Sequence, residues 1–408
     1  MNIIVGGKMK KLLFLFIVLF IANISPKAVQ LPNYIDITAD AVLLYSLDDD
    51  DYIYEKNADK EEILASLTKI MTAYTVIERV PNLNEKVTIT HDHLKNLYYY
   101  TCAGLEEGDE VTYLDLLYAM MLPSGADAAQ ALAYSVGGTE ENFIAMMNEE
   151  AQKLELYHTH FMDAYGGDDY NISTAREMAL LLKKALSNEL FNKIFKSDYY
   201  KLTNELEVYN YTGSIAKYHG LDESLITGSK MGYTTPAGLL LASTATINGK
   251  EYILIIMKSA ENFKLTQSVL DSYSVYNSIL DKTFNKRQLL KKGTLLKRID
   301  VNNSTISEYP IIIDENIYAT LSNEDYLAVS YDYHLVDSIS WEQKVGDNLG
   351  YVDISINNEV IATYNIYLKD EIYQYTPRSR TIIIIIIILV FISLTMICFN
   401  IFTKDKKK

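Results

Sequence analysis

A long apolar run near the C-terminus constrains this chain more than any other feature. Residues 381–402 contain an unbroken run of isoleucine at 382–388, and a lysine-rich end follows at 404–408. About 22 residues at about 1.5 Å each extend about 33 Å as a helix, enough to cross a hydrocarbon core of about 30 Å. Basic residues beside a membrane span stay on its cytoplasmic side. We therefore expect a transmembrane helix over 381–403 and a cytoplasmic basic tail over 404–408.

The N-terminus carries a targeting signal. Residues 12–24 form an apolar block that lysines precede. The block is short for a membrane span and typical of the apolar region of a secretory signal. We interpret residues 1–28 as a signal peptide or, because Pro26 fits a cleavage site poorly, as an uncleaved N-terminal anchor. Both Met1 and Met9 can serve as the start.

Between its two ends, the chain is expected to be exported and to lie on the extracytoplasmic face of the cell membrane.

A length of 408 residues with 49% hydrophobic residues is enough for two domains with their own cores. A formal net charge of −16 repels phosphate backbones, so nucleic acid is not an expected partner. The two cysteines, Cys102 and Cys398, are too few for a Cys-based zinc site, and their positions argue against a disulfide.

Hydrophobic periodicity predicts an α/β (α+β) domain over residues 33–285. Helical spacing of apolar residues predicts five helices, at 67–77, 113–122, 126–136, 139–156 and 174–186. Other patterns predict four strands, at 41–46, 52–54, 238–247 and 251–257. Asn248-Gly249 predicts a hairpin turn between the last two strands, and Thr174 with Glu177 predicts a capping box at the start of the last helix. Strands at both ends with helices between favour a largely antiparallel sheet flanked by helices. A small all-β accessory domain is expected over 290–370, and a linker over 371–380.

Ser66 and Lys69 stand three residues apart at the start of a predicted helix. This spacing places them on one helix face, where a desolvated lysine that has lost its proton can act as general base for the serine hydroxyl. The pair alone is a weak signal, because Ser214 and Lys217 repeat its spacing. A serine that caps a helix beside a surface lysine is the simpler interpretation of an isolated pair.

Two further motifs follow in order along the chain. Ser124 and Gly125 lie between two predicted helices, and Lys230, Gly232 and Tyr233 precede a predicted strand. The three motifs, roughly 55 and 105 residues apart, match the Ser-x-x-Lys, Ser-x-Asn and Lys-Thr-Gly set of penicillin-interacting serine enzymes. Three elements in this order are far more specific than any one of them.

With these motifs the chain resembles the serine-type D-alanyl-D-alanine carboxypeptidases, which are low-molecular-mass penicillin-binding proteins. The segments that carry the resemblance are 54–78, 104–129, 170–181 and 228–257, and residues 344–361 resemble the family's C-terminal accessory domain. The resemblance implies a penicillin-binding/β-lactamase-like catalytic domain. The implied partners are a peptidoglycan stem peptide ending in D-Ala-D-Ala and β-lactams as acylating inhibitors. No metal or organic cofactor is implied.

The resemblance also implies a role for each motif residue. Ser66 attacks the carbonyl of the penultimate D-alanine, Lys69 takes its proton, and Ser124 relays a proton to the leaving D-alanine. The implied substrate-binding residues are Gly125, Lys230, Gly232 and Tyr233. Among these, Lys230 helps to hold the terminal carboxylate. The backbone N–H groups of Ser66 and Tyr233 form the oxyanion hole, where each donor contributes about 3–4 kcal/mol in comparable acyl-transfer sites.

Two positions depart from the family pattern. Ala126 stands where asparagine is usual and Met231 where threonine is usual, so hydrogen bonds to Lys69 and to the substrate are lost. Each such bond to a charged group contributes about 1.5–3 kcal/mol. We expect an enzyme, a serine-type carboxypeptidase whose activity these changes can reduce. Two alternatives stay open: a catalytically weak penicillin-binding or regulatory protein of the cell wall, and a serine β-lactamase.

Overall fold

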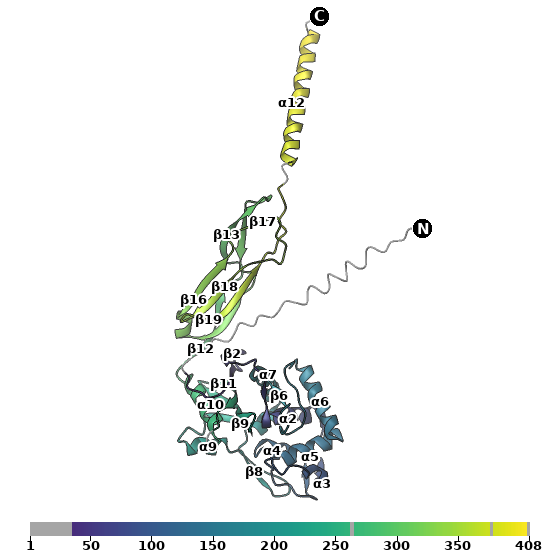
Figure 1. Ribbon diagram of the computed structural model, residues 1–408, viewed down its shortest axis with the longest axis vertical. Helices are drawn as coiled ribbons and strands as arrows, with labels where there is room; N and C mark the ends of the chain where they lie inside the picture. The colour runs from purple at the N-terminus through teal and green to yellow at the C-terminus, as the bar shows by residue number, and fades with distance from the viewer. Residues whose placement is uncertain (1–34, 262–264, 376–377, 406–408) are drawn as a thin grey trace, which may run out of the picture. The chain divides into compact units, whose positions relative to one another are not determined.

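The computed structural model describes residues 35–261, 265–375 and 378–405 (Figure 1). The predicted N-terminal signal, 1–28, and the chain end, 406–408, lie outside the described residues. The chain divides into two compact units. The first comprises Met1–Arg287 with Tyr318–Ala328, and the second comprises Gln288–Ile317 with Val329–Lys408.

An antiparallel sheet with strand order β2-β1-β11-β10-β9 forms the centre of the first unit. Its strands are β1 (Ala41–Ser46), β2 (Asp51–Lys56), β9 (Ile226–Thr234), β10 (Gly238–Ile247) and β11 (Lys250–Ser259). The turn between β10 and β11 consists of Asn248 and Gly249, whose φ angles of 54° and 79° suit a two-residue hairpin. The predicted antiparallel sheet is confirmed.

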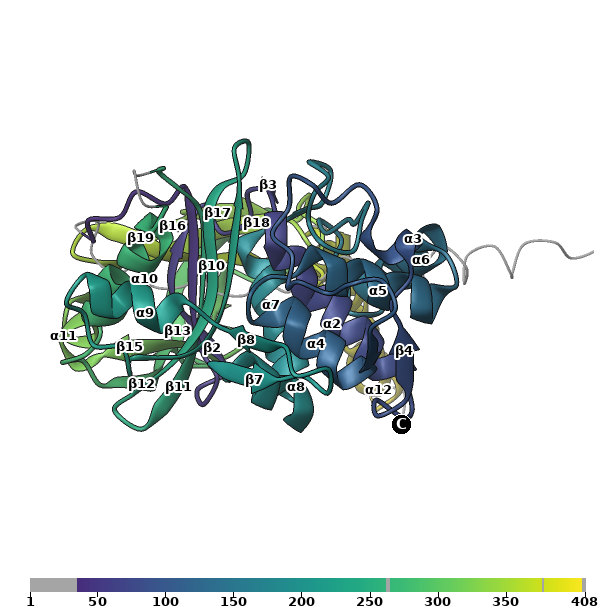
Figure 2. The ribbon, with the colours of Figure 1, turned by 90° about the horizontal axis from the view of Figure 1, so that it is seen from below.

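Both faces of this sheet are buried. Alternate side chains of a strand enter different hydrophobic clusters: Leu43 and Ile255 belong to one cluster, Leu44 and Leu254 to the other. On the first face α7 (Ala175–Leu186) contacts β1 and β11, and on the second α10 (Gln267–Asn277) contacts β10 and β11 (Figure 2). Burial on both sides explains why these strands are almost continuously apolar in sequence.

The remaining helices of the first unit extend the layer that begins with α7 (Figure 2). They are α2 (Thr68–Arg79), α4 (Tyr113–Met121), α5 (Ala126–Gly137), α6 (Glu140–Lys153) and α8 (Glu189–Phe195). Shorter helical segments are η1 (Ala65–Leu67), α3 (His91–Leu94) and α9 (Thr212–Tyr218). Short strand pairs are β3 (Glu62–Ile63) with β6 (Ile172–Ser173), β4 (Lys86–Thr88) with β5 (Glu110–Thr112), and β7 (Tyr199–Lys201) with β8 (Glu207–Tyr209).

Thr174 caps α7, because its side-chain oxygen accepts a hydrogen bond from the Glu177 backbone N–H at 3.1 Å. The Glu177 carboxylate is engaged elsewhere, by the backbone N–H of His158 and the hydroxyl of Thr159. In a capping box this carboxylate would instead accept a hydrogen bond from the backbone N–H of Thr174. The tertiary contact with residues 158 and 159 replaces that bond. Sequence spacing found the helix start, but it could not show this competing partner.

The second unit is built mainly of strands. One sheet has the order β14-β13-β17 and another the order β16-β18-β19. These strands are β13 (Leu295–Asn302), β14 (Glu308–Ile312), β16 (Val329–Leu335), β17 (Ser338–Ser340), β18 (Asn348–Ile356) and β19 (Glu359–Tyr367). The chain also contains β12 (Phe284–Leu290), which pairs with β15 (Ile317–Ser322), and α11 (Asn323–Leu327), which belongs to the first unit.

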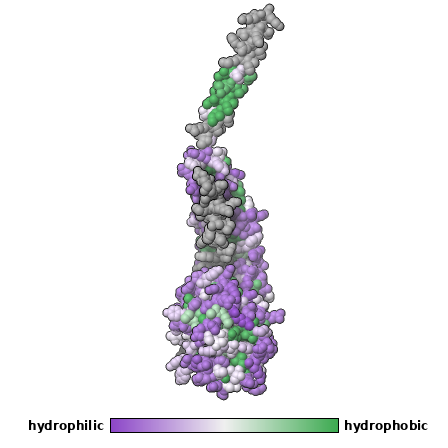
Figure 3. All heavy atoms as spheres, turned by 90° about the vertical axis from the view of Figure 1, so that its right-hand side faces the viewer, coloured by the Kyte–Doolittle hydropathy of each residue, from purple (hydrophilic) through white to green (hydrophobic). Residues whose placement is uncertain are grey.

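The isoleucine run lies in α12 (Arg378–Asp405), a helix of 28 residues. Figure 3 shows hydrophobic side chains gathered along this helix, and Ile384 and Ile387 are more than half exposed. Among the residues that the structure describes, no helix meets the combined length and hydrophobicity required of a membrane span.

Candidate active site

Ser66 lies in η1, directly before α2, and its position depends on a strained turn. Ala65 has a φ of 41°, which a non-glycine residue adopts only at a cost of about 1–3 kcal/mol. Gly166 packs against this turn, since a Cβ added there would lie 1.8 Å from the Ala65 carbonyl oxygen. The turn leaves Ser66 partly exposed at the start of the helix.

Lys69 is almost completely buried, and its amine faces Ser66. Lys69 Nζ lies 3.0 Å from Ser66 Oγ and donates to the Tyr165 carbonyl oxygen at 2.6 Å. Burial lowers the pKa of Lys69 to about 8, although the negative charges of Asp163 and Asp127 oppose this shift. A substantial fraction of the amine is therefore neutral near pH 8 and able to accept the serine proton.

Lys230 is a second buried amine, on β9. Its Nζ donates to the Met231 carbonyl oxygen at 2.9 Å. Burial and the nearby positive charge of Lys69 lower the pKa of Lys230 well below the usual lysine value. The third motif thus places a second buried amine near enough to Lys69 to be affected by its charge.

The strand β9 packs closely beside the Ser66 turn. β9 is the last strand in the sheet order, and a Cβ added at Gly232 would lie 3.2 Å from the Ser66 backbone nitrogen. Tyr233 follows and is 38% exposed. The backbone of β9 near Tyr233 and the backbone N–H of Ser66 therefore border the same region. Met231 instead packs against the hydrophobic cluster on the α10 face.

Ser124 lies in the tight turn between α4 and α5, with a φ of 67°. Gly125 is closely packed, since an added Cβ would lie 2.6 Å from the Ala119 carbonyl oxygen. α5 contacts α2, which carries Lys69. Among the described residues, the Ser124 hydroxyl has no hydrogen-bond partner. The helix that follows this turn is thus packed against the helix of the first motif.

A loop that the sequence motifs did not reveal completes the surroundings of Lys69. The buried Asp163 carboxylate accepts hydrogen bonds from the backbone N–H groups of four following residues, at 2.5–2.9 Å. It also accepts one from Asn171 Nδ2 at 2.9 Å. This loop presents the Tyr165 carbonyl to Lys69. The only sequence signal was the pair Gly166-Gly167 close after an aspartate.

The second Ser-x-x-Lys pair lacks these surroundings. Ser214 and Lys217 lie in α9, and the Lys217 side chain is 74% exposed and 3.6 Å from Glu223. The Lys217 amine therefore lies in water beside a carboxylate, whereas the Lys69 amine is buried beside a serine hydroxyl. Burial, rather than spacing, distinguishes the two pairs.

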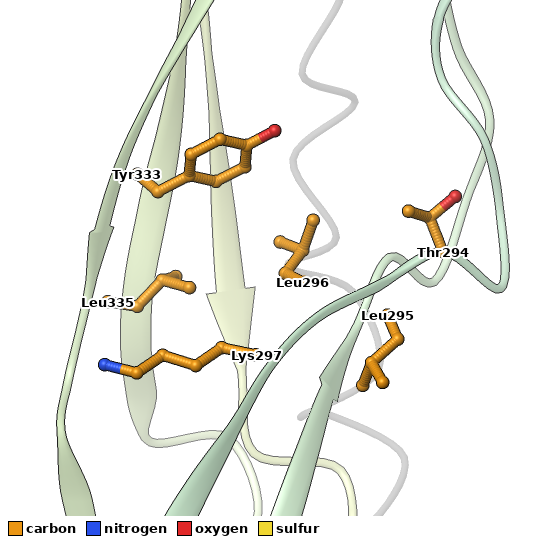
Figure 4. Close-up of a pocket in the computed structure, with 6 residues that line it drawn as sticks. All are labelled: Thr294, Leu295, Leu296, Lys297, Tyr333 and Leu335. Carbon is orange, nitrogen blue, oxygen red and sulfur yellow. The ribbon is translucent and has the colours of Figure 1, made fainter.

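The second unit contains a cavity of about 420 Å³ that is separate from these motifs (Figure 4). Figure 4 shows Tyr333 and Leu335, from β16, opposite the segment 294–297. The cavity lies in a different unit from Ser66, Lys69 and Lys230, so it is not the candidate active site.

A serine hydroxyl beside a buried amine, on a helical turn packed against an antiparallel sheet, defines a serine acyl-transfer hydrolase that uses lysine as its base. The family model described as D-alanyl-D-alanine carboxypeptidase matches residues 25–261, which is more than half of the chain. The chain belongs to this family, a class of serine-type carboxypeptidases. A second model, the C-terminal domain of penicillin-binding protein 5, matches residues 284–374.

Individual relatives agree with the family assignment. The D-alanyl-D-alanine carboxypeptidase DacF of Bacillus subtilis is 25% identical over 348 residues, which is 82% of this chain and 85% of the relative. The D-alanyl-D-alanine carboxypeptidase of Streptomyces sp. strain K15 is 34% identical over 226 residues, 51% of this chain and 76% of the relative.

Solved structures show the same fold. The D-alanyl-D-alanine carboxypeptidase DacD of Francisella tularensis matches with a TM-score of 0.59 at 20% identity, covering 86% of this chain and 96% of that one. The Streptomyces K15 DD-transpeptidase matches with a TM-score of 0.54 at 31% identity, covering 59% of this chain and 97% of that one. The predicted mixed α/β penicillin-binding fold with an all-β C-terminal domain is confirmed.

Proposed function

We propose that this chain is a membrane-anchored carboxypeptidase that removes the terminal D-Ala from peptidoglycan stem peptides through an acyl-enzyme on Ser66. The observation that carries the proposal is the 3.0 Å separation of Lys69 Nζ and Ser66 Oγ, with the amine buried. Family membership supports the reaction class. The role of each residue is part of the proposal.

In the first step, the neutral Lys69 amine takes the proton of Ser66 Oγ while the oxygen attacks the carbonyl carbon of the penultimate D-alanine. The carbonyl oxygen becomes an oxyanion, which the backbone N–H groups of Ser66 and Tyr233 stabilise. The packing of β9 beside the Ser66 nitrogen supports this placement. Preorganised donors of this kind are a large contribution to acyl transfer.

Collapse of the tetrahedral intermediate breaks the C–N bond to the terminal D-alanine. Ser124 relays a proton to the leaving amine, and the unengaged hydroxyl on the turn before α5 is suited to this role. Water then attacks the ester on Ser66, which releases the shortened peptide as a carboxylate and regenerates the serine hydroxyl. Atoms and charge balance without another reactant.

Lys230 is proposed to hold the terminal carboxylate of the substrate. Burial and Lys69 disfavour its charged form in the free protein. An incoming carboxylate stabilises the ammonium form by opposite charge, so substrate binding raises the pKa of Lys230 again. Gly232 and Gly125 belong to the same proposed binding region, since both admit close approach of the backbone.

The test is release of D-alanine from an N-acylated tripeptide ending in D-Ala-D-Ala. We expect the full chain to release D-alanine and Ser66→Ala to release none above background. Ser214→Ala is the matched control, since it removes the serine of the exposed Ser-x-x-Lys pair, and it should leave release unchanged. Equal release by wild type and Ser66→Ala would contradict the proposal.

We also propose the export and anchoring that the sequence predicts, with a catalytic domain over 33–285, an accessory domain over 290–370 and a single C-terminal anchor. The unbroken isoleucine run within α12, followed by a basic chain end, supports the anchor. The N-terminal apolar block supports export. The active site would then lie on the extracytoplasmic side, where the peptidoglycan substrate is.

A second candidate is a catalytically weak regulatory protein of the cell wall. Ala126 is buried and offers no side-chain hydrogen bond, and Met231 packs into a hydrophobic cluster. Each lost hydrogen bond corresponds to about 1.5–3 kcal/mol. If the site is weakened, the double variant Ala126→Asn, Met231→Thr should release D-alanine at least about tenfold faster. No gain would favour a site already adapted to its residues.

A further inference from the structure

The loop of residues 163–171 holds both reacting groups of the candidate active site. Its Tyr165 carbonyl accepts from Lys69 Nζ at 2.6 Å. Its Gly166 backbone packs on the Ala65 carbonyl of the turn that bears Ser66. A shift of this loop would therefore move the base and the nucleophile relative to one another.

One carboxylate ties the loop together. Asp163 Oδ1 accepts from the N–H groups of Tyr165 and Gly166 and from Asn171 Nδ2, at 2.9, 2.5 and 2.9 Å. Asp163 Oδ2 accepts from the N–H groups of Gly167 and Asp168, at 2.8 and 2.6 Å. Five donors around one buried carboxylate leave the loop little freedom.

The opposite side of the site lacks an equivalent partner. Ala126 begins α5, a helix that contacts α2, and its methyl group cannot accept a hydrogen bond from Lys69. The hydrogen bonds of Lys69 Nζ within the described residues are those to Ser66 Oγ and to the Tyr165 carbonyl. The Tyr165 carbonyl is therefore the contact that orients the Lys69 amine toward Ser66.

We propose that Asp163 is a positioning residue for the acyl transfer: by fixing the loop, its carboxylate sets the Tyr165 carbonyl that holds Lys69 toward Ser66. This inference rests on the proposed function, in which Lys69 is the general base. Asp163 itself touches neither substrate nor Ser66, and it acts through Tyr165 and the turn at Ala65.

The charge of Asp163 gives the inference a distinctive signature. The titratable groups that act on Lys69 are Asp163, Asp127 and Cys102, and Lys69 acts on Lys230. Asp163 is the leading influence that raises the pKa of Lys69 against burial. Removing its charge, or letting the Tyr165 carbonyl move away, favours the neutral amine, and both effects lower that pKa.

The experiment compares the full chain with Asp163→Asn in the rate of acylation by a fluorescent penicillin, from pH 5 to pH 10. On the plateau of the pH profile, we expect Asp163→Asn to be acylated roughly 10- to 100-fold more slowly than wild type. A displacement of a catalytic group by about 1 Å has an effect of this size. We also expect the midpoint of the Asp163→Asn pH profile to fall below that of wild type. An unchanged plateau and midpoint would overturn the inference.

Asp115→Asn is the matched control. Asp115 is also fully buried and accepts several hydrogen bonds, from Thr112, Tyr200 and Thr203, but it orders the start of α4. Its replacement should lower the melting temperature without moving the pH midpoint. If Asp115→Asn moves the midpoint as far as Asp163→Asn, general loosening explains the effect and the inference fails.

Asn171→Ala is a second variant, which decides the question if Asp163→Asn does not fold. It keeps the Asp163 carboxylate but removes one of its five donors, together with the acceptor of the Met162 and Asp163 backbone N–H groups. We expect a slowing in the same direction. An Asn171→Ala rate equal to wild type would then overturn the inference. Ser66→Ala separates the two levels: acylation that survives it refutes the proposed function, whereas normal acylation by Asp163→Asn refutes the positioning role alone.

Discussion

At the scale of single residues, the site depends on two lysines that the fold keeps out of water. A buried amine is costly when charged, so the protein holds Lys69 and Lys230 where the neutral form is favoured. Ser214 and Lys217 show the opposite case, because the Lys217 side chain is exposed to water beside Glu223. The chemical difference between the two pairs therefore comes from burial, which no short motif contains.

The lowered pKa of Lys69 predicts how acylation depends on pH. Only the neutral amine can take the Ser66 proton, and the pKa of Lys69 is lowered to about 8. The rate of penicillin acylation by wild type should therefore rise with pH through about pH 8 and then level off. A stopped-flow fluorescence profile measures it. A rate that falls across the same interval would show that the protonated amine is the active form.

At the scale of elements, the helix α2 alone does not place the nucleophile. Ser66 lies in η1, before the first residue of α2, and the strained Ala65 is held by the loop that contains Gly166. β9 closes the other side through Gly232. The site is thus assembled from three segments that are far apart in sequence, and glycine is needed where two of them meet.

Substitution of Gly166 tests this assembly. Gly166→Ala introduces a Cβ 1.8 Å from the Ala65 carbonyl oxygen, at a φ of 89°. We expect the free energy of unfolding to fall by more than about 3 kcal/mol and acylation to slow at least about tenfold. Denaturant unfolding and penicillin labelling measure the two effects.

Gly108→Ala is the control for backbone strain alone. Gly108 has a similar φ of 94°, but an added Cβ would meet no atom within 4 Å. It should cost about 1–2 kcal/mol, the usual penalty of the left-handed conformation, and leave acylation intact. If both variants behave alike, contact between the loop and the Ser66 turn does not matter.

At the scale of the whole molecule, the proposed anchor determines where the enzyme works. Deletion of residues 378–408 removes the isoleucine run together with the basic end. We expect the full chain to sediment with membranes after expression in a bacterium, and the deleted chain to be recovered in the soluble or secreted fraction with its penicillin binding retained. Immunoblots of the fractions measure this. Recovery of the full chain in the soluble fraction, or its release from the membranes by a salt wash without detergent, would contradict the anchor.

Much of this molecule could be predicted from its sequence. The hairpin of β10 and β11 followed from Asn248-Gly249, and the start of α7 followed from Thr174, because turn and cap chemistry are local. The role of the loop around Asp163 could not be predicted, because it depends on a contact between Tyr165 and Lys69, which are far apart in sequence. The partner of Glu177 was missed for the same reason.

The central claim is that Ser66 becomes a covalent acyl-enzyme because Lys69 activates it. Its most direct test is intact-protein and peptide mass spectrometry after incubation of the full chain with benzylpenicillin. We predict one added penicilloyl group, located on the peptide that contains Ser66 and absent in both Ser66→Ala and Lys69→Ala. An adduct on another residue, or a Ser66 adduct that forms at the same rate without the Lys69 amine, would contradict the account.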